Sequence, residues 1–309
     1  MSPNSSKTLK YGIHYYFCIK SLSMKKVLFP IALSGLLFFS SCSNEPKKSE
    51  SESTQMPDST TMVEDSATKK SKEILDFKFF YTIANLPSPM EMINAIYQND
   101  VPFNKEMLNS PSNEEKYNTA YKKAINYGVY GIDMAYAAFY GQNQDLLEYY
   151  STTRKLSEKL NVQETFDTFT QRFRENADNK DSLVSMIDRA YSETDAYLRS
   201  NHRLEVAAHV LAGSIMEVQY LSIELMKNQD QTKANAGIFE KIYNQKLYLE
   251  NLISLFDELK KYQSSKNLQD QLITLKKSFD AVKSPADLTK PTMAGLSAAV
   301  TKVRAEMIQ

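Results

Sequence analysis

Ala124 to Gln144 reads AINYGVYGIDMAYAAFYGQNQ and contains a single formal charge, that of Asp133. A helix formed by this stretch is apolar on nearly every side, which is typical of a helix at the centre of a protein. Gly128 and Gly131 lie inside it, although glycine costs about 1 kcal/mol relative to alanine in a helix interior. We therefore expect a neighbouring helix to approach closely at these glycines.

A second stretch, Val206 to Met216, also lacks formal charge. Small side chains give it a smooth surface: Ala207, Ala208, Ala212, Gly213 and Ser214. A smooth surface lets another helix backbone come close. The sequence therefore predicts that a helix over 113–140 and a helix over 202–227 pack together at the centre of the fold.

Helical periodicity continues on both sides of these segments, from Glu73 onward, and no convincing two-residue alternation is present. Several helix starts carry a capping residue with a carboxylate three residues on, as at Ser112 with Glu115 and Asn161 with Glu164. The predicted fold class is all-α, a single bundle of about nine or ten helices without the repeat of about 34 residues that marks one class of helical repeat protein. The predicted helices are 73–85, 89–99, 113–140, 143–160, 163–177, 181–200, 202–227, 233–262, 265–282 and 292–308.

An apolar signal lies near the start of the chain, where Met24 to Cys42 reads MKKVLFPIALSGLLFFSSC. Lys25 and Lys26 form a short positive region, Val27 to Phe39 is an apolar run, and small residues precede the cysteine. This order describes a secretory signal. The apolar run is too short to cross a bilayer, which needs about 20 residues.

The end of this signal, Phe39-Ser40-Ser41-Cys42, resembles the lipobox of bacterial lipoproteins, although the family pattern prefers leucine at the position of Phe39. The resemblance implies cleavage before Cys42 and acylation of Cys42 with chains such as palmitate, which would anchor the protein to the membrane. Each buried CH₂ of such a chain contributes about 0.8 kcal/mol. The alternative is an ordinary buried cysteine at the end of a core helix.

Two segments of the helical region are similar to a family of uncharacterised all-helical lipoproteins of Bacteroidota. They are Tyr127 to Asp133, YGVYGID, and His209 to Leu221, HVLAGSIMEVQYL. The resemblance implies a helical fold and lipid anchoring at the outer membrane, and it brings no assigned reaction. Surface-exposed lipoproteins of related bacteria often carry an acidic cluster after the cysteine. Ser43 to Lys47 matches that cluster poorly, which favours the periplasmic face.

These features divide the chain into four parts. Residues 1–23 precede the signal and are interpreted as an over-extended gene start, or else as a lengthened positive region. Residues 24–41 are the signal peptide, residues 42–72 are the lipidated cysteine with a flexible tether, and residues 73–309 are the helical domain. The tether is rich in Ser, Thr, Glu and Lys and too poor in apolar residues to offset the entropy of ordering.

Charge and cysteine content narrow the classes of function. Five of the 37 basic residues and none of the 37 acidic residues precede Cys42, so cleavage leaves 32 basic and 37 acidic residues, a net charge near −5. A mildly acidic domain argues against nucleic acid as a partner, because nucleic-acid binding needs clustered Lys and Arg. Cys18 would be removed with the signal, so the helical domain holds no cysteine and must be stabilised by packing alone.

His202, Glu205 and His209 are the best candidates for a metal site. On one helix they share a face at about 100° per residue, and the last two are four residues apart, which suits two ligands of one ion. The spacing matches neither the His-Glu-x-x-His of metalloproteases nor the recurring Glu-x-x-His of ferritin-like sites. The alternative is a solvent-exposed His202 and a core His209 with a hydrogen-bond partner. If the histidines are structural, the sequence predicts no cofactor. If His202, Glu205 and His209 form a site, the predicted cofactor is a divalent transition metal.

Asp133 and Glu217 are carboxylates within the two apolar helices. Burial without a compensating charge would raise the pKa of Asp133, and Tyr130 lies one turn before it. As a functional group, Asp133 would be a general acid or would bind a ligand. As a structural group, it would bond to Arg189 or Arg203 and fix the register of the helices. Glu217 is interpreted as one half of an ion pair between helices.

The chain carries no nucleophile elbow, phosphate loop or dinucleotide fingerprint, so no catalytic residue is predicted. The leading hypothesis is a non-enzymatic, membrane-tethered domain that binds an envelope protein or another envelope component. The second hypothesis is a lipoprotein that binds a metal or a small ligand through His202, Glu205 and His209.

Overall fold

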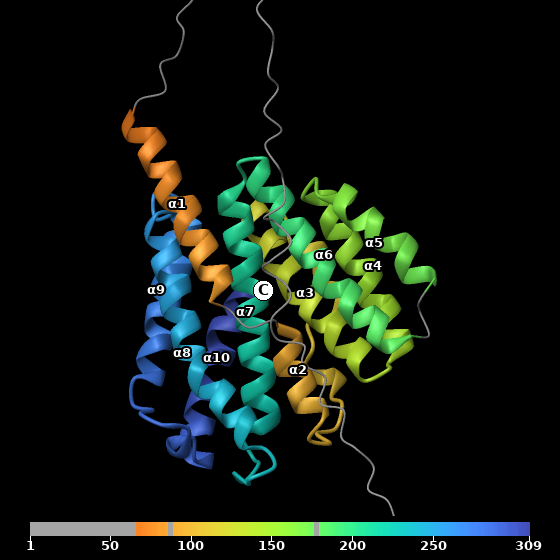
Figure 1. Cartoon of the computed structure of the whole chain (residues 1–309), viewed down its shortest axis with the longest axis vertical. Helices are drawn as coiled ribbons and strands as arrows, with labels where there is room; N and C mark the ends of the chain where they lie inside the picture. Colours follow the sequence, from red (N-terminus) through yellow and green to blue (C-terminus); the bar gives the residue numbers. More distant parts are fainter. Residues whose placement is uncertain (1–65, 86–88, 176–178) are drawn as a thin grey trace, which may run out of the picture. The chain divides into compact units, whose positions relative to one another are not determined.

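The computed structural model describes residues 66–85, 89–175 and 179–309. The signal peptide, Cys42 and the tether up to residue 65 lie outside the described residues. The chain divides into two units, and all described residues belong to the second, Met62–Gln309. Their regular structure is helical throughout, with ten α-helices, three short 3-10 helices and no strand (Figure 1). The predicted all-α fold class is confirmed.

The predicted helices agree with the observed ones in order, and most ends lie within a few residues of the expected positions. The α-helices are α1 Ser66–Ala84, α2 Pro89–Tyr97, α3 Ala120–Phe139, α4 Asn143–Lys159, α5 Gln163–Glu175, α6 Lys180–Ser200, α7 Leu204–Met226, α8 Ala236–Asp257, α9 Gln263–Phe279 and α10 Lys290–Ile308. The 3-10 helices are η1 Lys105–Met107, η2 Pro111–Lys116 and η3 Pro285–Asp287.

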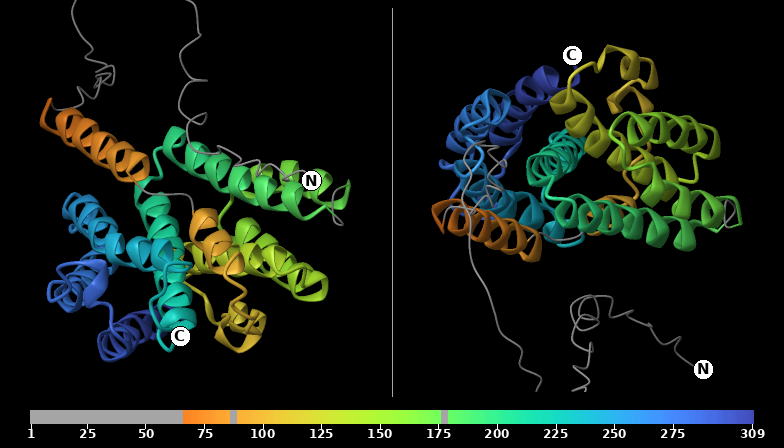
Figure 2. Two further views of the ribbon diagram at one scale, coloured as in Figure 1. Left: turned by 60° about the horizontal axis from the view of Figure 1, so that its bottom comes forward. Right: turned by 90° about the horizontal axis from the view of Figure 1, so that it is seen from above.

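The central helix of this unit is α7. It contacts α1, α2, α3, α6, α8 and α10, and Figure 2 shows it enclosed by its neighbours. Its most extensive contact is with α3, which confirms the prediction that these two apolar helices pack together. By length and composition alone α7 could cross a membrane, but 78% of its most apolar window is buried inside the protein. That burial is the pattern of a core helix.

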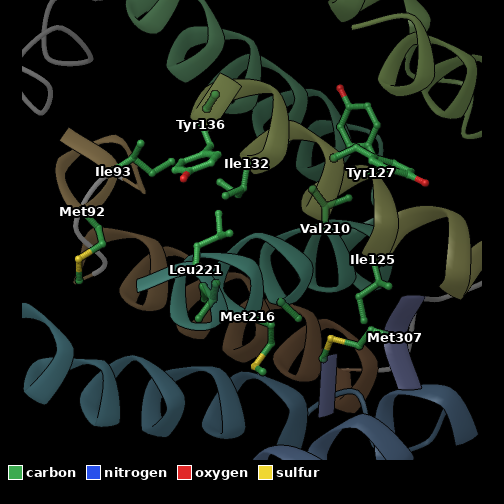
Figure 3. Close-up of a cluster of buried hydrophobic side chains, with 14 of the residues drawn as sticks. Met92, Ile93, Ile125, Tyr127, Ile132, Tyr136, Val210, Met216, Leu221 and Met307 are labelled. Atoms are coloured by element: carbon green, nitrogen blue, oxygen red, sulfur yellow. The ribbon is translucent and has the colours of Figure 1, made fainter. Parts of the chain in front are cut away.

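Two glycines allow the backbones of α3 and α7 to touch. A Cβ atom on Gly128 would lie 2.1 Å from the carbonyl oxygen of Val210, and one on Gly213 would lie 1.9 Å from that of Ile125. Both distances are far below van der Waals contact, so a side chain is excluded at either position. The side chains of Ile125 and Val210 belong to the buried cluster drawn in Figure 3. The close approach expected at Gly128 is confirmed, and Gly213 is its counterpart on α7.

The helix predicted over 113–140 is divided, because η2 ends at Lys116 and α3 begins only at Ala120. Between them, Tyr117 donates its hydroxyl hydrogen to the carbonyl oxygen of Ile308, 191 residues further along the chain. Thr119 accepts a hydrogen bond from the backbone N–H of Lys122 and so caps the start of α3.

The first helix, α1, begins at Ser66, inside the segment predicted as a tether up to residue 72. The added turns contain Ala67, Lys69 and Lys70, and alanine and lysine both favour helix. The polarity of these residues favours a tether, whereas their helix propensity favours a helix. The first helix therefore begins earlier than residue 73.

Three helices end on a residue in the left-handed backbone conformation. These residues are Gly141 after α3, Asn161 after α4 and His202 after α6, with φ angles of 64°, 53° and 56°. After α6 the backbone N–H groups of His202 and Arg203 turn back to carbonyl groups in the last helical turn, as in a Schellman motif. Glycine and asparagine adopt this conformation readily, whereas histidine is strained in it.

His202→Gly is expected to raise the free energy of unfolding by about 0.5–1 kcal/mol. A non-glycine residue in this conformation costs roughly 1–2 kcal/mol, and the chain entropy of glycine offsets part of the gain. Ala196→Gly is the matched control, because Ala196 is also exposed but lies in the regular part of α6. There the substitution should cost about 1 kcal/mol. Urea denaturation measures both variants, and a loss at both positions would contradict the strain at His202.

Candidate functional site

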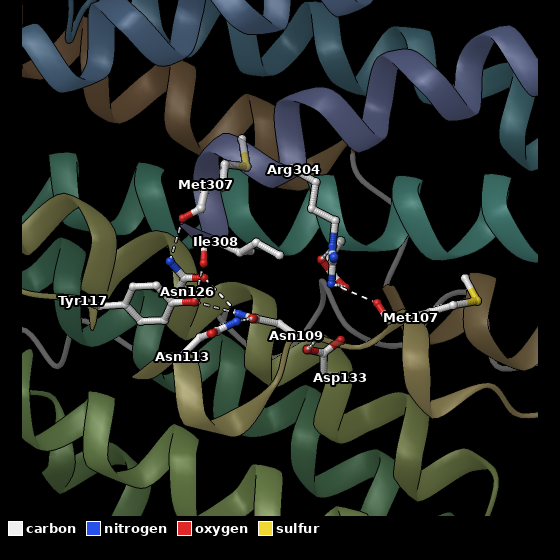
Figure 4. A network of polar contacts seen from close by, with 10 residues as sticks. Met107, Asn109, Asn113, Tyr117, Asn126, Asp133, Arg304, Met307 and Ile308 are labelled. Atoms are coloured by element: carbon white, nitrogen blue, oxygen red, sulfur yellow. Dashed lines mark hydrogen bonds and ion pairs between the residues drawn. The ribbon is translucent and has the colours of Figure 1, made fainter. Parts of the chain in front are cut away.

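Asp133, Glu217 and Arg304 meet in the centre of the domain, from α3, α7 and α10 respectively. Both carboxylates have no exposed surface, and Arg304 is 7% exposed. The Nε and Nη2 atoms of Arg304 each lie 2.6 Å from a different carboxylate oxygen of Glu217, which makes a bidentate ion pair. Nη2 also donates to the carbonyl oxygen of Met107 at 3.1 Å (Figure 4). The guanidinium carbon lies 4.0 Å from the ring centre of Tyr220, a cation–π contact.

Asp133 lies beside this ion pair with only one oxygen satisfied. Its Oδ2 atom accepts a hydrogen bond from the backbone N–H of Asn109 at 3.1 Å, whereas Oδ1 has no donor among the described residues. Burial, and after it the negative charge of Glu217, raises the pKa of Asp133 well above its usual range. One guanidinium thus faces two carboxyl groups, and the cluster is neutral when Asp133 is protonated.

Amide and phenol groups join this cluster to the last residues of α10. The side-chain amide of Asn109 donates to the hydroxyl of Tyr117 at 2.9 Å and to Oδ1 of Asn126 at 3.2 Å. Asn126 donates to the carbonyl oxygen of Met307 at 2.9 Å, and Tyr117 donates to that of Ile308 at 3.1 Å (Figure 4). The network therefore fixes α10 against α3 and against the loop between η1 and η2.

Tyr130 lies one turn before Asp133 on α3. It donates its hydroxyl hydrogen to the carbonyl oxygen of Ser110 at 2.7 Å. Burial raises the pKa of this hydroxyl, so it stays neutral and acts as a hydrogen-bond donor to the backbone. Tyr130 thereby holds the residue that precedes η2.

The prediction that Arg189 or Arg203 neutralises Asp133 is wrong. The neighbouring cation is Arg304, whereas Arg189 is exposed on α6 and Arg203 donates to a backbone carbonyl. Sequence reasoning missed Arg304 because it lies 87 residues after Glu217, on a helix with an ordinary amphipathic pattern. Glu217 itself stands in an ion pair between two helices, α7 and α10.

The three predicted metal ligands occupy different environments. His202 is exposed and precedes α7, outside the helical face on which it was expected. His209 is 2% exposed, and its Nε2 atom lies 3.0 Å from the hydroxyl of Ser265, which lies 3.5 Å from a carboxylate oxygen of Glu205. Burial lowers the pKa of His209 to about 4, so the ring is neutral at pH 7. No cluster of three potential ligands is present within the described ranges, and metal binding stays a prediction.

The depressions on the surface of the described residues include the following two. One of about 260 Å³ lies between η2 and α4 and is lined by acidic, lysine and hydroxyl side chains. Another of about 380 Å³ lies beside Tyr97 and Tyr140. Neither is lined by Asp133, His209 or Glu217. Neither depression reaches the buried acidic cluster, whose Glu217–Arg304 ion pair joins α7 to α10.

No family model, no curated protein and no solved structure matches this chain.

Proposed function

We propose that this chain is a lipid-anchored helical lipoprotein of the cell envelope, held at the outer membrane with its domain on the periplasmic side. In this proposal the domain acts by binding an envelope component rather than by catalysis. The observation that carries it is the secretory signal at Met24 to Cys42, whose end is similar to a lipobox. Acylation of Cys42 gives the membrane anchor, and the segment after it links the anchor to the helices.

The buried acid–base groups of the domain support a binding role, because each of them makes a contact inside the fold. Glu217 is paired with Arg304, Asp133 accepts from the backbone of Asn109, and His209 contacts Ser265. Asp133, Glu217 and His209 are at most 2% exposed. A partner therefore meets the outer helix surfaces and not these groups.

Cys42→Ala is expected to abolish anchoring, because the acylated atom is the thiol sulfur. The unsubstituted protein should appear in the membrane fraction without residues 1–41 and with the mass of its acyl chains. The variant should be released or remain uncleaved. Cys18→Ala is the matched control, because Cys18 precedes the cleavage point and its loss should change neither location nor mature mass.

Mass spectrometry of detergent-extracted and soluble fractions reads both variants. A Cys42→Ala protein that still carries lipid would overturn the assignment. A cytosolic product with its first 41 residues intact would overturn it equally.

A further inference from the structure

The outer face of α1 is apolar and uncovered within the described part of the chain. Ile74, Phe77, Phe80 and Tyr81 are 38%, 67%, 57% and 52% exposed. At about 100° per residue these four side chains span about 120° on one side of the helix. The rings of Phe77 and Tyr81 stack with their centres 6.4 Å apart. These four large apolar side chains form a patch on one helix face, which the exposed Lys70 and Glu73 share. Apolar patches of a few hundred Å² on a protein surface are often functional.

The opposite face of α1 fixes the orientation of this patch. Phe79 is completely buried, and Thr82 donates its hydroxyl hydrogen to the carbonyl oxygen of Asn251 at 3.2 Å. Lys78 forms an ion pair with Glu258 at 2.7 Å. These contacts hold α1 at the edge of the helical domain, against α8 (Figure 1). Because the inner face is already packed, the outer face cannot be covered by a rotation of the helix.

The size of the patch favours a lipid surface over a second protein. Its exposed area is roughly 400 Å², given the full area of aromatic side chains. A stable protein–protein interface needs about 800 Å² from each partner. Insertion into a bilayer has no such threshold, because affinity scales with the buried apolar area and needs no matching shape.

The position and charge of α1 also favour a lipid bilayer as the partner of this patch. It begins 24 residues after Cys42, so its start lies at most about 85 Å from the proposed anchor, whatever path the chain takes. Lysines outnumber acids along it: Lys69, Lys70, Lys72 and Lys78 against Glu73 and Asp76. Lys78 is paired with Glu258, and the other three lysines still outnumber the two acids. Basic residues and exposed aromatic side chains are both found in segments that lie in a membrane interface.

We propose that the outer face of α1 inserts into the surface of the phospholipid bilayer that holds Cys42. Phe77, Phe80 and Tyr81 enter the boundary between headgroups and acyl chains, and the exposed Lys70 faces anionic headgroups. The inference rests on the proposed lipid anchor, which keeps α1 close to the bilayer. Its consequence is a domain held against the membrane in one orientation.

The test uses the absence of tryptophan from this chain. Phe77→Trp introduces a single tryptophan into the protein, which is purified from membranes and reconstituted into vesicles. The vesicles contain equal parts of zwitterionic and anionic phospholipid, with or without bromine on the acyl chains. Side chains in an interface lie about 5–10 Å deep, within reach of bromine. We expect emission at short wavelength and loss of most of the intensity in the brominated vesicles.

Leu147→Trp is the matched control, because Leu147 is a 56% exposed apolar residue on α4. Its emission should stay at long wavelength and should be equal in both kinds of vesicle. Quenching at both positions would mean general adsorption and would overturn the proposal. If Phe77→Trp loses helical circular dichroism, Phe80→Trp reports from the same face.

The mass of the purified protein separates this inference from the proposed function. Acylated Phe77→Trp protein whose fluorescence is not quenched would overturn the inference and leave the anchor intact. A short-wavelength emission without quenching would mean that protein covers the face, which also overturns it. Unacylated Phe77→Trp protein whose fluorescence is quenched by added vesicles would overturn the anchor and support lipid binding by α1.

Discussion

Arg304→Met is expected to lower the free energy of unfolding by about 3–5 kcal/mol, because it leaves a buried carboxylate without its partner. Glu217 has no exposed surface, and the substitution also removes the hydrogen bond to the carbonyl oxygen of Met107. Asp133, beside it, offers no compensating charge. Since a domain has a total stability of about 5–15 kcal/mol, urea denaturation should detect a large shift of the midpoint.

The loss of stability caused by Arg304→Met should grow as the pH rises. The guanidinium of Arg304 lowers the pKa of Asp133, so its removal raises that pKa further in the folded state. A carboxyl group with a raised folded pKa contributes its full stability below its unfolded pKa, near 4. That stability is lost as the pH rises through the folded pKa. The variant should therefore differ least from the unsubstituted protein near pH 4 and most at pH 8.

Arg154→Met is the matched control for this prediction. The side chain of Arg154 is 45% exposed and lies 3.4 Å from Glu158, so its removal should change stability by no more than about 0.5 kcal/mol. The double variant Arg304→Met/Glu217→Met should recover most of the loss, because apolar replacement of a buried pair is often neutral. An equal effect of the two arginine substitutions would contradict the buried ion pair.

Gly213→Ala is expected to cost about 3 kcal/mol, at the upper end of the range for overpacked cores. The new Cβ atom would lie 1.9 Å from the carbonyl oxygen of Ile125 and 2.9 Å from its carbonyl carbon. Both neighbours are backbone atoms of α3, so the clash is relieved only by moving a whole helix. Gly128→Ala should behave alike, because its Cβ would lie 2.1 Å from the carbonyl oxygen of Val210.

Gly295→Ala is a control for which the expected change in stability has the opposite sign. Gly295 is exposed within α10, and a Cβ atom there meets nothing within 4 Å. The substitution should stabilise the protein by about 1 kcal/mol, the difference in helix propensity. Thermal and urea unfolding of the three variants measure the effects side by side. A stabilising Gly213→Ala would contradict the direct backbone contact between α3 and α7.

Local sequence patterns were sufficient for the helices and for the pairing of α3 with α7. The reason is that a stretch with one charge, Asp133, and a stretch of small residues around Gly213 can only be buried at the centre. Local sequence patterns failed where tertiary contacts determine the conformation of the chain. The predicted helix over 113–140 is interrupted at Tyr117, whose hydroxyl donates to the distant Ile308. His202 ends α6 in a conformation for which glycine or asparagine would have been expected.

The candidate site was predictable in part for the same reason. Asp133 and Glu217 stand out in sequence as charges within apolar helices. Arg304 does not, because α10 has other exposed charges and nothing local distinguishes this one. Asn109 lies in a loop, and only the fold brings its backbone N–H to Asp133. A buried cation for two carboxylates can be required by physical reasoning, but its position comes from packing.

The order in which the cluster is synthesised bears on when the domain can fold. Asp133 and Glu217 leave the ribosome well before Arg304, which follows Glu217 by 87 residues. Until α10 has been made, closing α3 and α7 over these groups means burying carboxylates with no cation, which is unfavourable. A nascent polypeptide that is to be exported, as proposed above, is thereby kept from completing its core early. Because Arg304 becomes available late to neutralise these carboxylates, the domain is favoured to fold after translocation.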